Sequence, residues 1–213
     1  MSCCQGHEAF FNKKVAHKNL KRYRKKGPHK VSQYLIEALK SKGLNGMTLL
    51  DIGGGIGSIQ HELIKAGLKK AVSIDAPSAY INASKEEAKR QGHSDRVTYH
   101  QGDFVDLSDQ VDSTDIVTLD KVICCYPDME AIVSHSVKKA KKVYAIVFPR
   151  INLLMLMIKP ILNLLSWLRH DPCRFYLHSP QKVESIIIAE GLERQSFFKT
   201  FVWQILLYER RSD

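Results

Sequence analysis

Short apolar runs alternate with segments of helical periodicity along most of this chain, and this alternation constrains its fold more than any other feature. Helical patterns, with apolar residues three and four positions apart, fill most of the intervals between the runs. Strands that are joined through helices run parallel, so the pattern predicts a parallel sheet with helices on both faces. The five runs of strand length lie at 48–52, 71–75, 97–100, 115–120 and 142–148.

Two further strands are expected at the C-terminal end, at 192–199 and 201–208. They are joined too closely for a helical crossover, so they must pair antiparallel. Ser179 followed by Pro180 is typical of a helix start, and it places one more helix before this hairpin. The predicted fold class is therefore α/β, with a doubly wound, seven-stranded sheet that ends in an antiparallel hairpin.

A glycine-rich stretch, LDIGGGIG at 50–57, lies between the first predicted strand and a helix. Ligands bind at this edge of doubly wound sheets, where missing side chains let the backbone approach a ligand and a helix start offers free N–H groups. The dinucleotide pattern G-x-G-x-x-G is absent, because its sixth position is Ser58 counted from Gly53 and Gln60 counted from Gly55. The stretch instead reads D-x-G-x-G-x-G, with Asp51, Gly53, Gly55 and Gly57.

Acidic residues stand at or just after the ends of the next three predicted strands. Asp75 ends the second strand, 18 residues past Gly57, where a carboxylate can bind ribose hydroxyls. Asp103 and Phe104 follow the third strand, and Asp120 ends the fourth. Taken one at a time, such acids are helix caps or surface groups more often than ligands. Their joint order places three acids at one edge of the predicted sheet.

The D-x-G-x-G-x-G pattern and these acids together resemble the cofactor motif of class I S-adenosylmethionine (SAM)-dependent methyltransferases. That family has a seven-stranded Rossmann-like sheet whose last two strands form a hairpin. The resemblance implies a methyl-transferring enzyme with SAM as cofactor and S-adenosylhomocysteine (SAH) as product. The cofactor-binding residues that it implies are Asp51, Gly53, Gly55 and Gly57 at the loop, Asp75 for the ribose, Asp103 and Phe104 for the adenine, and Asp120 beside the methionine end.

Three short stretches suggest a closer relationship. The stretch 174–178, after an apolar segment and before a helix, resembles the C-terminal region of magnesium-protoporphyrin O-methyltransferases. The stretches 122–128 and 202–204 resemble uncharacterised bacterial relatives of that group. The basic N-terminal segment with Cys3 and Cys4 departs from the porphyrin enzymes, so the resemblance does not name the acceptor.

Methyl transfer requires alignment of the acceptor, and it requires a base only if the acceptor holds a proton at neutral pH. For His178 the alternative is a residue at a helix start whose ring bonds to the backbone. A carboxylate acceptor needs no base, and Tyr23 or Arg24 would then position it. No metal site is predicted, because the adjacent cysteine pairs lack the C-x₂-C spacing of zinc sites. The candidate catalytic residues are His178, Tyr126, Asp120 and Tyr23, with His135 as a further candidate base.

The stretch 151–168 is apolar almost throughout. Asn152, Lys159 and Pro160 interrupt it, and a lysine at the centre of a bilayer costs about 2.5–3.5 kcal/mol on insertion scales. We therefore expect a kinked pair of helices rather than a membrane span. Two roles stay open: a cover over the pocket of a small apolar or amphipathic acceptor, or a helix whose leucines pack on the sheet.

The chain carries a net charge of +10, and nine lysines and arginines lie between residues 12 and 30. We expect residues 1–45 to form a basic helical extension and residues 46–213 to form the methyltransferase domain. The extension is a lid, a contact with an anionic membrane, or a binding segment for RNA. No RNA-recognition motif accompanies the charges, so an RNA-binding protein or RNA methyltransferase is the less favoured alternative to an enzyme for small molecules. The oligomeric state stays open.

The cysteines bear on the cellular compartment. Their number is odd, four of the five stand in adjacent pairs, and the N-terminal residues do not resemble a secretory signal peptide. We therefore expect reduced thiols and a cytoplasmic protein, either free or peripheral to a membrane.

Overall fold

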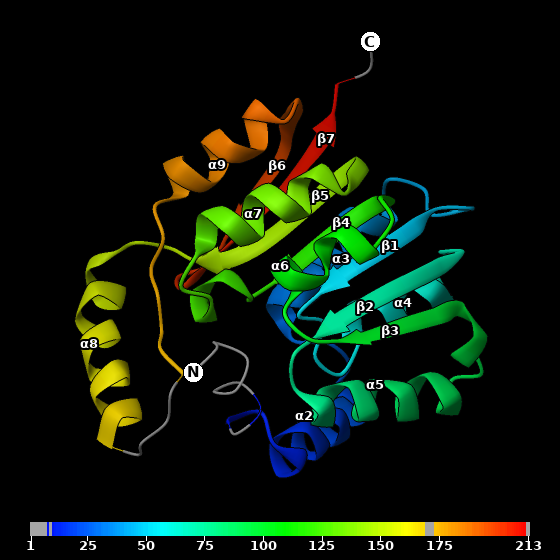
Figure 1. The fold of residues 1–213 in the computed structure, drawn as a ribbon, viewed down its shortest axis with the longest axis horizontal. Helices are drawn as coiled ribbons and strands as arrows, with labels where there is room; N and C mark the ends of the chain where they lie inside the picture. The colour runs from blue at the N-terminus through cyan, green and yellow to red at the C-terminus, as the bar shows by residue number, and fades with distance from the viewer. Residues whose placement is uncertain (1–7, 9, 169–172, 212–213) are drawn as a thin grey trace.

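The computed structural model describes residues 8, 10–168 and 173–211, so Cys3 and Cys4 lie outside it, and its centre is a seven-stranded sheet (Figure 1). Strands β1 to β5 pair in parallel, whereas β7 runs antiparallel to both β5 and β6. The order β3-β2-β1-β4-β5-β7-β6 confirms the predicted sheet and its C-terminal hairpin. The strands are β1 (Thr48–Ile52), β2 (Lys70–Asp75), β3 (Val97–Gln101), β4 (Thr114–Asp120), β5 (Ala140–Pro149), β6 (Leu192–Lys199) and β7 (Trp203–Arg210).

Apolar side chains alternate between the two faces of the sheet, as the period of a strand requires. Leu50 belongs to one core cluster, with residues of α7 and α9, and the adjacent Leu49 belongs to the other, with residues of α3 and α4. Both faces are buried, as is usual for parallel strands that are joined through helices. The helices are α2 (Lys13–Lys26), α3 (Lys30–Lys40), α4 (Ser58–Lys65), α5 (Ser78–Arg90), α6 (Phe104–Leu107), α7 (Met129–Lys138), α8 (Leu153–Leu168) and α9 (Pro180–Ala189), with 3₁₀ turns η1 (Ser94–Arg96), η2 (Ser108–Gln110) and η3 (Ile123–Cys125).

Helix α2 lies outside these layers and packs on α5 (Figure 1). Ala16, Leu20 and Tyr23 recur at helical spacing and are buried in a cluster with Tyr80 and Ala83 of α5. The opposite side of α2 holds its lysines in solvent. Helix α3, by contrast, is buried in the core of the sheet. Of the two helices described before β1, α2 therefore packs on α5, whereas α3 packs on one face of the sheet, and the predicted division at residue 45 stays a prediction.

Strand β7 begins at Trp203, two residues later than predicted. In the turn before it, the backbone N–H of Thr200 donates to the carbonyl oxygen of Trp203 (2.8 Å). The N–H of Trp203 donates in return to the hydroxyl of Thr200 (2.9 Å). Residues 201 and 202 therefore close the turn instead of extending the strand.

The apolar stretch 151–168 forms the single helix α8 with Pro160 inside it, so the expected pair of helices is wrong. A proline removes one backbone donor, which interrupts the ladder of hydrogen bonds without ending this helix. The expectation that its leucines pack on the sheet is wrong as well, because Met155 is the one buried residue of α8. No helix in the described part of the chain is both long enough and apolar enough to span a bilayer.

The carboxylate of Asp51 is buried at the end of β1. Its Oδ1 accepts a hydrogen bond from Thr118 (2.7 Å), whereas its Oδ2 has no partner among the described residues. Burial raises the pKa of this carboxyl to about 7, helped by the negative charges of Asp120 and Asp75 and opposed in part by the bond from Thr118. The folded chain therefore holds a proton here at pH values where the unfolded chain has released it.

We expect the substitution Asp51→Asn to change how stability depends on pH. Because the folded-state pKa of this acid is raised, the wild type loses stability as pH rises from about 4 to about 7, and the variant lacks that loss. Between pH 5 and pH 8 the two free energies of unfolding, measured by urea titration, should diverge by on the order of 3 kcal/mol. Asp109→Asn, at an exposed acid, should follow the wild type. Parallel profiles for Asp51→Asn and wild type would contradict the prediction.

Candidate active site

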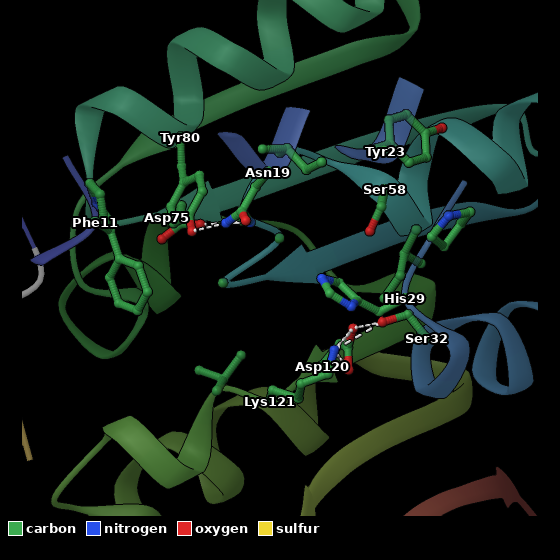
Figure 2. Close-up of a pocket in the computed structure, with 18 of the residues that line it drawn as sticks. Phe11, Asn19, Tyr23, His29, Ser32, Ser58, Asp75, Tyr80, Asp120 and Lys121 are labelled. Atoms are coloured by element: carbon green, nitrogen blue, oxygen red, sulfur yellow. Dashed lines mark hydrogen bonds and ion pairs between the residues drawn. The ribbon is translucent and has the colours of Figure 1, made fainter. Parts of the chain in front are cut away.

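A cavity of about 300 Å³ lies at the edge of the sheet where β1, β2 and β4 end (Figure 2). The loop 53–56 between β1 and α4 forms one wall, together with Asp75 from the end of β2. Asp120 and Lys121, from the end of β4, form another. The helical side of the cavity includes Phe11, Asn19, Arg22, Tyr23, His29, Ser32 and Tyr80.

Three glycines of the loop have positive φ angles: 63° at Gly53, 59° at Gly55 and 78° at Gly57. A Cβ atom at Gly53 would stand 2.6 Å from Cγ2 of Val122, and one at Gly57 would stand 2.6 Å from Nε2 of Gln60. A side chain at either position would therefore require its neighbours to shift, and the positive φ would add strain. A Cβ atom at Gly55 would meet no atom within 4 Å, so this glycine keeps an open side at the cavity that it lines.

The carboxylate of Asp75 borders the cavity and accepts a hydrogen bond from the backbone N–H of Gly55 (2.7 Å). Burial raises the pKa of this carboxyl to about 6, although hydrogen bonds from the N–H groups of Gly55 and Ala76 lower it in part. The group is therefore ionised at neutral pH, where it holds the glycine loop by a charge-assisted bond.

A second, smaller cavity of about 50 Å³ adjoins the first and shares Gly53, Asp75 and Val122 with it. Asp103 and Phe104 also line it. The Asp103 carboxylate caps α6 by accepting from the N–H of residue 105 (3.0 Å), and it accepts the hydroxyl proton of residue 126 (2.9 Å). The predicted ribose and adenine acids thus border one continuous region. These donors and acceptors, beside the open side of Gly55, fit a nucleoside cofactor.

Asp120, Lys121 and Ser32 form a hydrogen-bonded cluster in the cavity wall (Figure 2). The Lys121 amine lies 2.7 Å and 2.8 Å from the two carboxylate oxygens of Asp120 and donates to Ser32 Oγ (2.9 Å). Ser32 Oγ donates in turn to Asp120. Lys121 is the one non-glycine residue with a positive φ (64°) in the described part of the chain, which is a strained conformation. In this backbone conformation the Lys121 amine reaches the carboxylate of Asp120, the residue before it.

Of the four catalytic candidates, Asp120 and Tyr23 line the main cavity and Tyr126 lines the smaller one. The hydroxyl of Tyr23 donates to Glu62 (2.7 Å), and burial raises the pKa of this phenol far above its ordinary value. The hydroxyl of Tyr126 likewise donates to Asp103. Both phenols are donors to carboxylates, which disfavours either as a base.

His178 lines neither cavity. Its Nε2 stands 2.8 Å from the carbonyl oxygen of Ile123 and 3.1 Å from that of Tyr126, so Nε2 carries the proton and donates it. Burial lowers the pKa of the ring. The alternative expected from the sequence, a ring at a helix start that bonds to the backbone, matches this arrangement. His135 is exposed on α7, where its ring bonds to the carbonyl oxygen of Ala131.

Sequence reasoning missed the contribution of α3. His29 and Ser32, at the start of that helix, line the cavity, and burial lowers the pKa of the His29 ring with help from two neighbouring positive charges. Arg24, by contrast, pairs with Glu86 and Glu87 of α5. The spacing of apolar residues predicted α3 itself. No local pattern, however, indicates which residues of α3 lie beside the strand ends.

Comparison with known proteins agrees with this geometry. A family model described as a methyltransferase domain matches residues 44–169, more than half of the chain. Ribosomal protein L11 methyltransferases of Salmonella newport and Salmonella enteritidis are 37% identical to this chain over 71 residues, or 33% of it. The chain spans about a quarter (24%) of the length of these curated relatives.

Solved structures share the fold over nearly the whole chain. A magnesium protoporphyrin IX methyltransferase from Synechocystis PCC 6803, with bound SAH, has a TM-score of 0.74 at 20% identity and covers 96% of this chain and 98% of its own. An O-methyltransferase family protein from Burkholderia thailandensis has a TM-score of 0.71 at 16% identity, covering 97% and 63%. At these identities the likeness is one of fold. By the family model that matches more than half of it, the chain belongs to the methyltransferase-domain family.

Proposed function

We propose that this methyltransferase transfers the methyl group of SAM to a small apolar or amphipathic acceptor in the cavity beside the glycine loop. The observation that carries the proposal is the mixed character of the cavity wall. Polar side chains line both the strand ends, at Asp75 and Asp120, and the helical side, at Asn19 and His29. Phe11, Tyr80 and Val122 give the wall an apolar part. A few polar groups in an otherwise apolar wall are typical of small-molecule sites.

The strand-end residues fit the cofactor of the family, and their individual roles are part of the proposal. The open side of Gly55 and the position of Asp75 on both cavities support it. Asp51 acts differently: its Oδ2 would lie 2.6 Å from a Cβ at Gly54, so it supports the loop from beneath. The roles are Gly53, Gly55 and Gly57 for the methionine part, Asp75 for the ribose hydroxyls, Asp103 and Phe104 for the adenine, and Asp120 for the methionine end.

When bound, SAM supplies a methyl group on a positively charged sulfur, which is a good leaving group. The residues of the chain then have to align the acceptor and exclude water. Asn19 and Tyr23 of α2 and His29 beside α3 line the cavity on its helical side. We therefore propose that the basic extension is a lid over the site.

If the acceptor holds a proton at neutral pH, we propose His29 as the base, with Asp120 as the second candidate. His29 lines the cavity, and its lowered pKa keeps the ring neutral and able to accept a proton at neutral pH. Asp120 also lines the cavity, but its two oxygens are already bonded to Lys121 and Ser32. We propose positioning roles for His178, Tyr126 and Tyr23, whose polar atoms donate to neighbouring acceptors.

The size of the cavity supports a small acceptor. At about 300 Å³ it stands at the lower end of the range for ligand pockets, and the proposed cofactor site lies in the same cavity, which leaves little room for an acceptor as large as a porphyrin. The RNA-binding alternative stays a prediction that rests on the lysines of α2, and the cytoplasmic location likewise stays a prediction.

The ribose role of Asp75 predicts that Asp75→Ala weakens SAH binding by tenfold or more, because a hydrogen bond to a charged group contributes about 1.5–3 kcal/mol. Isothermal titration calorimetry should give the wild type a Kd in the micromolar range. Asp109→Ala, at an exposed acid, should leave the affinity unchanged. Wild-type protein that gives neither heat nor a thermal shift with SAH would exclude the assigned site.

Gly55 and Gly43 allow a matched test of the loop. Both have positive φ (59° and 74°), and a Cβ at either would meet no atom within 4 Å, but only Gly55 lines the cavity. Gly55→Ala and Gly43→Ala should each lose about 1–2 kcal/mol of unfolding free energy through backbone strain. Only Gly55→Ala should also lose SAH affinity, by about tenfold in calorimetry. Equal SAH affinities in the two variants would show that the backbone of Gly55 does not face the cofactor.

The lid role of α2 predicts that SAH binding slows hydrogen–deuterium exchange of its amides by several-fold, because closure over the ligand suppresses local opening. Helix α9, none of whose residues lines the cavity, is the internal control and should exchange at one rate with and without SAH. Unchanged exchange in α2 would argue for a fixed wall instead of a lid.

A further inference from the structure

Helix α8 exposes a large apolar surface. Ten of its 16 residues are large apolar side chains that stand exposed, among them Leu153 (75% exposed), Met157 (62%) and Trp167 (64%). Scattered exposed apolar residues are ordinary, but a continuous apolar surface on a helix marks a contact with something other than water. None of the residues that line the cavity belongs to α8, so the proposed site does not account for this surface.

The polar residues of α8 lie on its covered side. The Asn163 side chain donates to the carbonyl oxygen of Phe175 (3.1 Å) and accepts from its N–H (2.7 Å). Lys159 and Ser166, four residues before and three after, are half-buried on the same side. A helix at the surface of a water-soluble protein has the opposite arrangement, with its polar face in solvent. The pattern indicates that the outer face of α8 is built for an apolar environment.

The same surface continues past the start of the helix. Phe201, at the tip of the β6–β7 turn, is 68% exposed, and its carbonyl oxygen accepts a hydrogen bond from Asn152 (2.9 Å). Ile151 beside it is exposed as well. The outer face of α8 with Ile151 and Phe201, which we name the apolar face, therefore draws on two separate parts of the chain.

The segment of sequence that holds most of this apolar face is basic. Between residues 148 and 182 the sequence has five lysines and arginines against one acid. Helix α2 adds an exposed stripe at helical spacing, Lys14, Lys18, Lys21 and Lys25, whose amines take part in no ion pair among the described residues. Helix α8 directly follows β5 and α2 lines the cavity, so both lie at the edge where the parallel strands end (Figure 1).

We propose that the apolar face docks the protein on the surface of an anionic lipid bilayer, with α8 lying in the plane of the interface and the lysine stripe of α2 facing lipid phosphates. A 16-residue helix is about 24 Å long, shorter than the ~30 Å hydrocarbon core, so it suits the interface and not a span. Helices that lie in a membrane interface typically insert apolar side chains into the acyl boundary and carry basic residues beside them.

The charges favour a bilayer over a second copy of this chain. In a symmetric dimer through the apolar face, the basic segments of both copies would meet around the interface and repel each other. Anionic lipid offers the complementary charge, and each lysine near such a surface contributes about a fivefold increase in affinity. RNA would satisfy the lysines of α2 but would leave the apolar face uncovered.

The test is flotation of the full chain with vesicles of phosphatidylcholine alone or mixed with phosphatidylglycerol. Wild-type protein should float with the anionic vesicles and lose most of that binding at high salt. The variant Leu153→Asn/Met157→Gln/Leu164→Gln should lose at least tenfold in vesicle binding, because it places polar groups in the acyl boundary. Ile188→Gln, at an exposed isoleucine of α9, is the matched control and should bind as wild type.

The lysine stripe is tested separately. The variant Lys18→Gln/Lys21→Gln/Lys25→Gln should bind anionic vesicles at least tenfold more weakly and with a smaller dependence on salt. In a Trp203→Phe background, emission of Trp167 should shift to the blue when anionic vesicles are added. Both multiple variants should bind SAH as the wild type does, which separates loss of docking from loss of the cofactor site.

Three outcomes would overturn the proposal. The first is wild-type protein that fails to float with either vesicle. The second is a wild-type dimer, seen in sedimentation, that the α8 variant dissociates while vesicles have no effect, which would assign the apolar face to a second copy. The third is binding of single-stranded RNA that the lysine variant abolishes, without any vesicle binding by the wild type.

Discussion

The register of three parallel strands is the constraint on which the site depends. Ile52 of β1 pairs with Ile74 of β2 on one side and with Leu119 of β4 on the other. The next residue along each of the three segments therefore lies at one level and at one edge of the sheet. These three residues are Gly53, Asp75 and Asp120. They span 68 residues of sequence, yet backbone pairing makes them neighbours.

Packing then fixes the loop that leaves β1. Gly53 is pressed against Val122 and Gly57 against Gln60, so the loop is tight on its inner side and open only toward the cavity at Gly55. The edge holds two unfavourable features: a buried carboxylate oxygen of Asp51 without a partner among the described residues, and a positive φ at Lys121. Such strain persists where the surrounding structure over-determines the conformation, and it is characteristic of functional sites.

Helix α8 is held to the rest of the molecule by different interactions from the other helices. The helices on the two faces of the sheet bury most of their apolar residues against it, and this burial holds them in place. In α8 hydrogen bonds of Asn152 and Asn163 to backbone groups hold the helix, and the apolar side chains point outward. A hydropathy pattern cannot show this inversion, because it reports which residues share a face and not which face meets the protein.

The sheet could be predicted from the sequence because the patterns that specify its strands involve residues close together in the chain. Strand length, apolar composition and short connections fix which elements form, and the hairpin at 192–208 follows from a turn too short for a crossover. The positions of the glycines and strand-end acids could be predicted for the same reason, because each is adjacent in sequence to its own strand. The later start of β7 could not, because it depends on hydrogen bonds between Thr200 and Trp203 in one particular turn.

The sequence on its own established the fold class, the glycine loop and the acids of the family motif, since these depend on neighbours along the chain. Only the tertiary structure decided that Ser32 reaches Asp120 across 88 residues of sequence and that His178 bonds to the backbone outside the cavity. It also decided that α8 turns its apolar side outward. These contacts join distant segments, and their geometry follows from how whole layers pack, which no local pattern of residues encodes.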